Sequence, residues 1–393
     1  MSTPESSPAA RTRSGRRVLI GAAAAVVLAA GATTAVVLAG PAGSTHAGSA
    51  ARLTASSCSG PAGAAYIADA GWDGFSAINT ANCDIVQTYN VGDTPVPGDS
   101  GDYNYSSTDE AVALHGSTLY FADTGSDTIS VIDAATLDPS NYNPTETDIH
   151  VGFDPEDLAV TPDGSQLWVA DTGPQTQVDS PAAISVISTA TNTVIRTITL
   201  RSAPAQIAFS PSGGTAYVTT AAGLVSYSTG SGQVTGSVPG LGDPHGIAVS
   251  PDGSTLYVTN TSQGEVDVIN AATDKVTGTI GVGQMPWQLV LSASGTTLYV
   301  ADADSDQVSV IATGTGKVTS TWSISGGPAT LALTPDGSQL WVAGITSAIV
   351  TVIDTANGTE VGSLNLGGDG ANSGDGYEPT GIVLTGTPTP GAS

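Results

Sequence analysis

The sequence predicts an all-β fold, a seven-bladed β-propeller in which each blade is a four-stranded antiparallel sheet. A short motif, an aromatic residue followed by small or β-branched residues, recurs seven times at separations of 40 to 54 residues, the spacing of propeller blades. Short runs rich in Val, Ile and Thr alternate with turns rich in Gly, Pro and Asp, as expected for short strands. Charged residues make up only 11% of the chain, whereas glycine is abundant at 49 residues. This composition favours strands over helices.

The motif copies define the blades. They begin at Tyr66, Tyr120, Trp168, Tyr217, Tyr257, Tyr299 and Trp341. The copy at Tyr257 is the clearest, and it predicts four strands at 244–249, 256–260, 265–270 and 275–280. Ser250-Pro251-Asp252-Gly253 is the first turn, because proline presets φ and glycine accepts a positive φ. We expect the aromatic residue of each motif to pack between neighbouring blades.

These motifs resemble the YVTN family of β-propeller repeats, a WD-like repeat class found in exported and surface-layer proteins. The resemblance covers about residues 60–386 and implies an exported, surface-layer-like propeller. Two copies depart from the pattern. The copy at Tyr66 has no strand before it, and the copy at Tyr217 has Thr220 and a third strand that we expect to be short.

The missing strand of the first blade has a donor at the other end of the chain. Residues 378–385 repeat the first-strand pattern, and no further strand follows them. We therefore expect residues 380–385 to pair beside residues 64–69 and to close the ring, which limits exposed strand edges. The propeller domain is expected to span 51–387, with a short flexible tail at 388–393.

The first 50 residues read as an export signal or a membrane anchor. Residues 1–17 end in basic residues, and residues 18–40 carry no charge before Pro41. This is the layout of a signal peptide, yet the apolar run is long enough to span a bilayer, so cleavage and anchoring both stay open. Arg16-Arg17 loosely resembles a twin-arginine signal, and the export route also stays open. In either case we expect an extracellular protein, secreted or held at the plasma membrane only through residues 18–40.

The charge and the cysteines agree with an extracellular protein. The formal net charge is −26, which disfavours nucleic acid as a partner and is compatible with metal cations, basic partners or plain solubility. The chain has only two cysteines, Cys58 and Cys83. In an exported chain they predict one disulfide, which would pin the blade built from both chain ends.

Loop insertions predict which face of the ring carries function. We call the top face the one with the loops that join strand two to strand three and strand four to the next blade. Insertions fall at 92–108, 172–182 and 367–377 on the top face and at 137–147 on the opposite, bottom face. Repeat folds often carry binding surfaces on such loops. Asp369, Asn372 and Asp375 in the last top insertion are candidate calcium ligands, although the segment matches no EF-hand loop.

A second set of candidates should ring the top mouth of the central channel. The residue after the proline that opens each first strand, and the residue following it, are expected to point there. The candidate ligand-binding residues at or beside these positions are Glu110, Glu156, Asp157, Gln206, His245, Trp287 and Glu378. Carboxylates, one imidazole and one indole at a channel mouth are able to bind a cation or a polar ligand.

No catalytic motif stands out, so we expect a non-enzymatic binding or scaffold protein, a monomer, with an unidentified protein or cell-envelope ligand. The alternative is a metal-dependent propeller enzyme of the lactonase or lyase kind. That activity would rely on Glu110, Glu156, Asp157 and His245 at the channel mouth.

Overall fold

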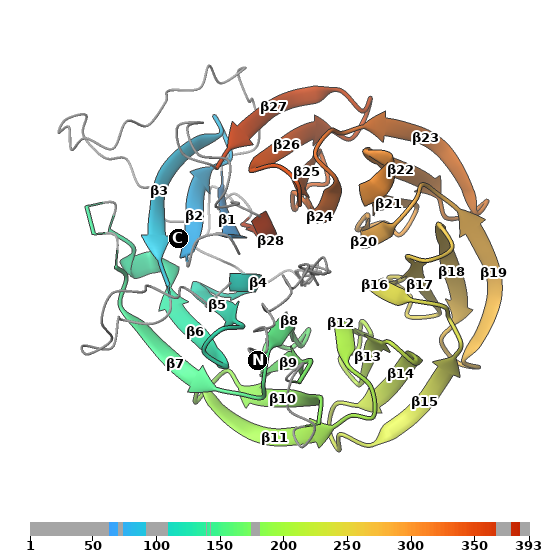
Figure 1. Cartoon of the computed structure of the whole chain (residues 1–393), viewed down its shortest axis with the longest axis horizontal. Coiled ribbons are helices and arrows are strands. Elements are labelled where there is room, and N and C mark those ends of the chain that lie inside the picture. The colour runs from blue at the N-terminus through green and yellow to red at the C-terminus, as the bar shows by residue number, and fades with distance from the viewer. Residues whose placement is uncertain are drawn as a thin grey trace, which may run out of the picture.

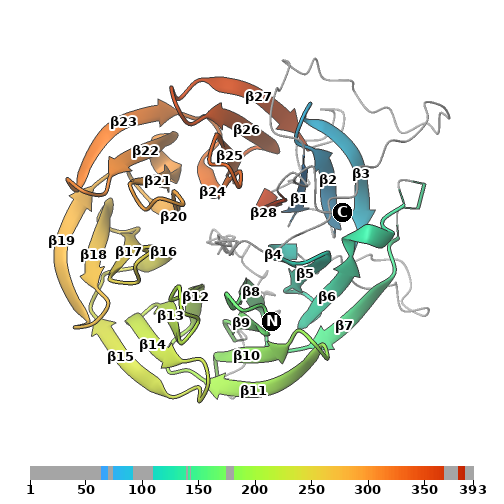
Figure 2. The same cartoon turned by 180° about the vertical axis from the view of Figure 1, so that it is seen from behind.

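The computed structural model shows a ring of seven β-sheets (Figure 1; Figure 2 shows the ring from behind). It describes residues 63–69, 74–91, 109–138, 140–141, 143–173, 181–366 and 379–385. These residues form seven four-stranded antiparallel sheets arranged in a ring around a common centre. The predicted seven-bladed propeller is therefore confirmed.

In each blade the first strand lies nearest the channel and the fourth lies on the outside (Figure 1). Blade one comprises β28 (Pro379–Leu384), β1 (Ala64–Asp69), β2 (Gly74–Asn79) and β3 (Asp84–Asn90). Blade two comprises β4 (Asp109–His115), β5 (Thr118–Asp123), β6 (Thr128–Asp133) and β7 (Glu146–His150), with the 3-10 helix η1 (Ala134–Thr136) after β6. Blade three comprises β8 (Pro155–Val160), β9 (Gln166–Asp171), β10 (Ala183–Ser188) and β11 (Thr193–Thr199).

The remaining blades follow the same order around the ring. Blade four comprises β12 (Pro204–Phe209), β13 (Thr215–Thr220), β14 (Gly223–Ser228) and β15 (Val234–Pro239). Blade five comprises β16 (Pro244–Val249), β17 (Thr255–Asn260), β18 (Glu265–Asn270) and β19 (Lys275–Gly281). Blade six comprises β20 (Pro286–Leu291), β21 (Thr297–Asp302), β22 (Gln307–Ala312) and β23 (Lys317–Ser323), with η2 (Ala303–Ser305) after β21. Blade seven comprises β24 (Pro328–Leu333), β25 (Gln339–Gly344), β26 (Ile349–Asp354) and β27 (Glu360–Asn365).

In blades three, five and seven, the turn between the first two strands is held by an aspartate. In blade five, Oδ1 of Asp252 accepts hydrogen bonds from Ser250 Oγ (2.6 Å) and from the backbone N–H of Ser254 (3.0 Å). These bonds lower the pKa of Asp252 to about 2. Gly253 follows with a φ of +72°, which only glycine adopts without strain. The turn chemistry of the sequence therefore sets where each hairpin reverses.

One expectation about strand length is wrong. The third strand of blade four, β14, runs over six residues, as many as the third strand of the neighbouring blade. The repeat is shorter because only Ala221 and Ala222 join β13 to β14, so the turn and not the strand is reduced.

The ring closes as predicted. β28 pairs antiparallel with β1, with Ala65 opposite Leu384 and Ile67 opposite Ile382. Every residue of β28 is buried. The C-terminal strand is thus the innermost strand of a blade whose other three strands come from the N-terminal part of the propeller (Figure 1).

The hydrophobic core lies between blades, and the motif aromatics fill it. Trp168 and Trp341 are completely buried, and Tyr120 is nearly so. Trp168 of blade three packs against Ile207 and Ala216 of blade four, within one apolar cluster. The predicted structural role of these aromatics is confirmed.

Several predictions concern residues outside the described part of the chain. The export segment 1–50, the tail 388–393 and the insertions 92–108 and 367–377 belong to this group. Within the described residues, no helix is long and apolar enough to span a membrane. Cys83 is buried and is not a free thiol, but Cys58 lies outside the described residues, so their pairing stays a prediction.

Candidate functional site

Several candidate residues lie on the first, innermost strands of their blades. Six of the seven first strands begin at a proline, and β4 begins at Asp109 instead. Proline suits a strand start because it lacks the N–H that a continuing ladder would need. The residue after each proline is therefore the second residue of the first strand of its blade.

His245 and Trp287 form an aromatic pair on two of these strands. They occupy the same position in blades five and six, and their ring centroids are 3.9 Å apart at an interplanar angle of 34°. Trp287 is 8% exposed and packs against Ala329, with Met285 and Ile345 beside them. The indole N–H of Trp287 is buried and has no hydrogen-bond partner among the described residues.

Met285 adds a strained element to the same cluster. Its φ is +52°, in the left-handed region that a long side chain seldom adopts. Its backbone carbonyl accepts the N–H of Ala303 (3.0 Å), which holds the loop in place. Strain of this kind persists only where the surrounding structure enforces it, and it is common at binding sites.

Glu156 occupies the corresponding position in blade three. Its side chain is half-buried, and Oε1 accepts a hydrogen bond from Thr172 Oγ1 (3.3 Å). Thr172 Oγ1 also bonds to the carbonyl of Asp154 (3.1 Å), so the carboxylate is held beside its own loop. The position of Glu156 at the channel mouth stays a prediction.

In blades three, four and six, the next residue along the first strand has a different role from the one predicted. Asp157, Gln206 and Gln288 are at most 1% exposed, and each accepts a backbone N–H from the next blade. The bonds join Asp157 Oδ2 to Ile207 N (2.8 Å), Gln206 Oε1 to Ile247 N (2.7 Å) and Gln288 Oε1 to Leu331 N (2.5 Å). These side chains lie between blades and tie them together. The expectation that Asp157 and Gln206 point into the mouth is corrected accordingly.

A break in the strand register explains this correction. The pairing of the first two strands shifts at Pro155/Asp157, Pro204/Ile207 and Pro286/Leu289. At such a bulge two residues oppose one, so the simple alternation of side chains fails. Polar residues recur at this one position of the sequence, but the backbone N–H that each side chain binds belongs to the next blade and cannot be read from the local pattern.

Buried carboxylates support the loops that lead to the mouth. Asp171 at the end of β9 accepts hydrogen bonds from Ser185 Oγ (2.7 Å) and from the backbone of Gly152. Asp302 at the end of β21 accepts one from Ser309 Oγ (2.6 Å) and one from the backbone of Gly283. Burial raises the pKa of Asp171 to about 7, and it also raises the pKa of Asp302, although these hydrogen bonds oppose the shift.

The other candidate ligands lie beyond what the structure describes. Glu378, Asp369, Asn372 and Asp375 are outside the described residues, and only the backbone of Glu110 is described, as part of β4. Among the described residues there is no group of three or more His, Cys, Asp or Glu side chains that could hold a metal ion. The calcium site in 369–375 and the ligand roles of Glu110 and Glu378 stay predictions.

Comparison with solved structures shows the fold at low sequence identity. A functionally unknown protein from Desulfotomaculum acetoxidans DSM 771 matches with a TM-score of 0.65 and 16% identity, covering 82% of this chain and 99% of that one. Kuenenia stuttgartiensis hydrazine synthase matches with a TM-score of 0.58 and 19% identity, covering 72% and 90%. The dihydro-heme d1 dehydrogenase NirN in complex with DHE matches with a TM-score of 0.57 and 14% identity, covering 83% and 75%.

Comparison of the sequence identifies a family. No curated protein matches the chain. That the repeats belong to the YVTN family stays a prediction. The sequence profile of the family described as "Choice-of-anchor I domain" matches residues 64–312, more than half of the chain. The chain therefore belongs to the choice-of-anchor I domain family.

Proposed function

We propose that this protein is an extracellular binding module that holds its partner at the channel mouth on the top face. The description of the family as a choice-of-anchor domain supports a place at the cell surface. The observation that carries the binding role is the indole N–H of Trp287, buried without an acceptor beside the ring of His245. A buried donor without a partner costs about 1–3 kcal/mol, which an acceptor atom on a ligand offsets.

The sequence around the mouth supports this proposal. The residues that tie the blades together are alike, with Asp157, Gln206 and Gln288 in the same role. The residues just before them differ in chemistry from blade to blade, as Glu156 and Trp287 show. A stabilising role would be met by the same residue in every blade, whereas one particular ligand needs different groups at different points around it.

The test is to remove the indole N–H and keep an aromatic ring. Trp287→Phe should weaken partner binding because the ligand acceptor loses its donor, whereas an aromatic ring still packs against Ala329. Trp341→Phe is the matched control, since Trp341 also has a buried N–H without an acceptor but lies in the core between blades seven and one. His245→Ala removes the other ring of the pair.

The measurement is quantitative capture of solubilised cell-envelope components on the immobilised, exported protein. A component retained by the wild type and by Trp341→Phe, but lost with Trp287→Phe and His245→Ala, would support the proposal. Capture of the same components by all four proteins would overturn it. If the wild type instead hydrolyses a lactone, and Glu110→Gln with Glu156→Gln abolishes that activity, the enzymatic alternative replaces the binding role.

Calcium is a further part of the proposal, through Asp369, Asn372 and Asp375. An ion that binds only the folded chain stabilises it by about 2.7 kcal/mol at one hundred times its dissociation constant. The melting temperature should therefore rise with millimolar calcium, and it should rise less after Asp369→Asn with Asp375→Asn. Equal melting curves with calcium and with a chelator would overturn the calcium part of the proposal. They would not bear on partner binding at the channel mouth.

A further inference from the structure

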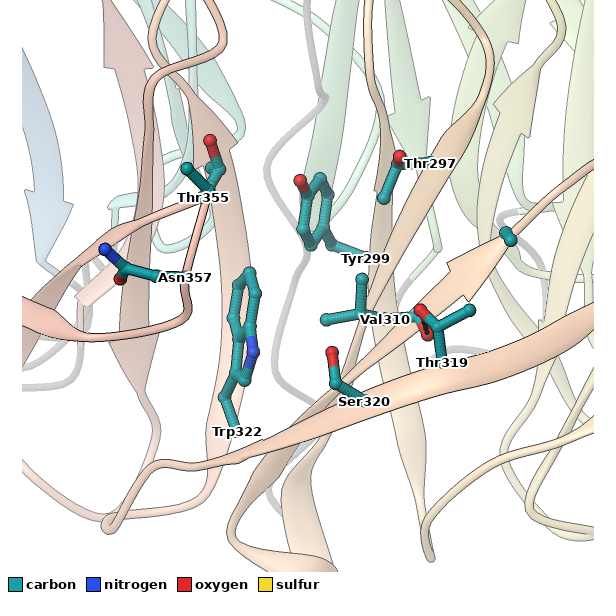
Figure 3. Close-up of a pocket in the computed structure, with 10 residues that line it drawn as sticks. Thr297, Tyr299, Val310, Thr319, Ser320, Trp322, Thr355 and Asn357 are labelled. Carbon is teal, nitrogen blue, oxygen red and sulfur yellow. Dashed lines mark hydrogen bonds between the residues drawn. The ribbon is translucent and has the colours of Figure 1, made fainter.

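A hollow lies among the outer strands of the ring, and none of the residues proposed for the channel mouth lines it. It has a volume of about 270 Å³ and lies where blade six meets blade seven (Figure 3). Its walls come from β21, β22 and β23 of blade six and from residues 355–357 of blade seven. The loop between β26 and β27, which supplies 355–357, belongs to the bottom face.

Two aromatic side chains form the centre of this hollow. The rings of Tyr299 and Trp322 are 5.5 Å apart at an interplanar angle of 38°, and Figure 3 shows both between Thr355 and Ser320. Behind the indole, a Cβ added to Gly358 would come within 2.1 Å of Trp322 Nε1. Gly358 has a φ of +73°, so both its backbone and its missing side chain suit the tryptophan. Trp322 is thus held between Tyr299 and Gly358 in a fixed orientation.

The groove between blades five and six has the same layout as the hollow between blades six and seven, but it has no tryptophan. Between blades five and six, Tyr257 and Gly316 take the places of Tyr299 and Gly358. Ile280 takes the place of Trp322: it pairs with Val266 as Trp322 pairs with Val308. Ile280 is 5% exposed and fills its groove, whereas Trp322 stays partly exposed. Packing alone is therefore satisfied by an aliphatic residue at this position.

The remaining lining is uncharged and mostly polar. It comprises Thr297, Val310, Ala312, Thr319, Ser320, Thr355, Ala356 and Asn357. The side-chain hydroxyls of Thr297 and Ser320 have no hydrogen-bond partner among the described residues. The hydroxyl of Thr355 bonds to that of Tyr299 and to the carbonyl of Gly337 (2.7 Å), which fixes the rim. The hollow thus combines a rigid aromatic surface with neutral hydrogen-bonding groups.

We propose that this hollow binds one pyranose ring of a neutral sugar. A pyranose has an apolar C–H face, which suits the surface of an indole, and an edge of hydroxyls that donate and accept hydrogen bonds. Thr297, Ser320 and Asn357 supply hydroxyl and amide partners for that edge. The volume lies just under the range of about 300–1,000 Å³ typical of drug-sized ligands, so it suits a single ring.

Charged ligands fit the hollow less well. No carboxylate lines it to pair with a cation, and no Lys or Arg lines it to pair with an anion. The net charge of −26 further disfavours an acidic sugar. A methylated ammonium group would use the rings but not the hydroxyls, and Tyr299 and Trp322 contact each other and do not surround a central space.

The test is saturation-transfer NMR on the exported protein with methyl glycosides of glucose, galactose and mannose, and with choline and glucuronic acid for comparison. Transfer to the C–H protons of at least one neutral glycoside is expected. The same measurement on an oligosaccharide that ends in the bound sugar shows whether the site takes a free sugar or the end of a glycan. Titration of the protein with that glycoside gives the dissociation constant.

Two variants copy the neighbouring groove, which the fold already accepts. Trp322→Ile copies Ile280, and Ser320→Gly copies Gly278, which holds the corresponding place opposite Val268. Trp322→Ile should weaken sugar binding at least about tenfold, which is about 1.4 kcal/mol. Thr315→Ala, at the place in the neighbouring groove that corresponds to Asn357, is the matched control and should leave binding unchanged.

Absence of transfer to every neutral glycoside would overturn the proposal, and so would equal affinity in the wild type and Trp322→Ile. Transfer to choline alone would replace the sugar with a cation. Because Trp287→Phe should leave sugar binding intact, the outcome at this hollow is independent of the outcome at the channel mouth.

Discussion

At the scale of single residues, one buried polar pair recurs near the top end of the blades. It joins the last residue of the second strand to a residue of the third, as Asp171 joins Ser185 and Asp302 joins Ser309. In blade five the carboxyl group is on the third strand instead of the second. Asn260 ends the second strand, and a hydrogen bond joins it to Asp267 of the third. Burial raises the pKa of Asp267 to about 6. Each of these pairs therefore places one carboxyl group where ionisation is unfavourable.

The sign of the resulting pH dependence follows from the direction of the shift. The pKa of Asp171 is about 7 in the fold, against an ordinary value of 3.8. The folded state therefore binds this proton more tightly than the unfolded chain does. Its contribution to stability is complete below about pH 4 and is lost as the pH rises through about 7. Asp157 and Asp302 are shifted in the same direction by burial.

We expect Asp171→Asn to raise the melting temperature at pH 8 and to flatten its dependence on pH between 5 and 8. The amide keeps an acceptor for Ser185 and carries no charge, and asparagine already serves at this position in blade five as Asn260. The gain at pH 8 should be about 1–3 kcal/mol, because each unit of pKa shift corresponds to about 1.4 kcal/mol. Thermal melts across this pH range measure it.

Asp252→Asn is the control for that experiment. Hydrogen bonds in its turn lower the pKa of Asp252 to about 2, so its contribution is lost only as the pH falls towards that value. The slope between pH 5 and 8 should not change in this variant. Identical slopes in Asp171→Asn and the wild type would show that Asp171 is not the titrating group.

At the scale of elements, the first strand of a blade does two things with adjacent residues. In blade four, Pro204 and Ala205 begin the strand, and Gln206 binds the backbone of the next blade. Gln206→Leu keeps the size of the side chain but leaves the N–H of Ile247 without an acceptor. We expect a loss of about 1–3 kcal/mol in the free energy of unfolding, because a buried unpaired donor bears its full desolvation cost.

Urea denaturation measures this loss as a lower midpoint at an unchanged slope. Gln263→Leu is the control, since Gln263 is exposed in the turn between β17 and β18. Equal midpoints for Gln206→Leu and the control would mean that the bond to Ile247 does not hold blades four and five together.

Most of these elements could be predicted from the sequence, because turns and periods are local properties. The strands of blade five were predicted to within a residue, and β28 was found by its likeness to other first strands. The directions of Asp157 and Gln206 could not be predicted, because they depend on a bulge that the pairing with the second strand creates. The hollow at Trp322 was also missed. Its only signal is a tryptophan where blade five has Ile280, and the groove that holds it comes from two blades.

Blade one is where we predict the disulfide between Cys58 and Cys83. Cys83 lies in the turn before β3 with a φ of +56°. A bond to Cys58 would close a loop of about 25 residues, worth about 3.5 kcal/mol on the chain-entropy argument. Mass spectrometry of a non-reduced digest should show the peptide that links Cys58 to Cys83. Alkylation of both thiols without a reductant would contradict the pairing.

At the scale of the whole molecule, stability depends on a strand that is contributed by the end of the chain. β28 buries Ile382 and Leu384 against Trp341 of blade seven, and Val383 lies in the cluster of Phe75. Thr330 Oγ1 of blade seven donates a hydrogen bond to the carbonyl of Thr380 (2.8 Å). The same six residues thus serve blades seven, one and two, and no local repeat can replace them.

Truncation after Gly376 should therefore abolish cooperative folding or lower the melting temperature strongly. It removes the whole of β28, exposes the inner edge of β1 and opens the contact between blades seven and one. Truncation after Thr387 removes only the tail at 388–393 and should leave the melting curve as it is. Calorimetry of both truncated proteins and of the full chain measures their melting temperatures. A propeller that melts at the same temperature without residues 377–393 would show that closure by β28 contributes nothing to the stability of the ring.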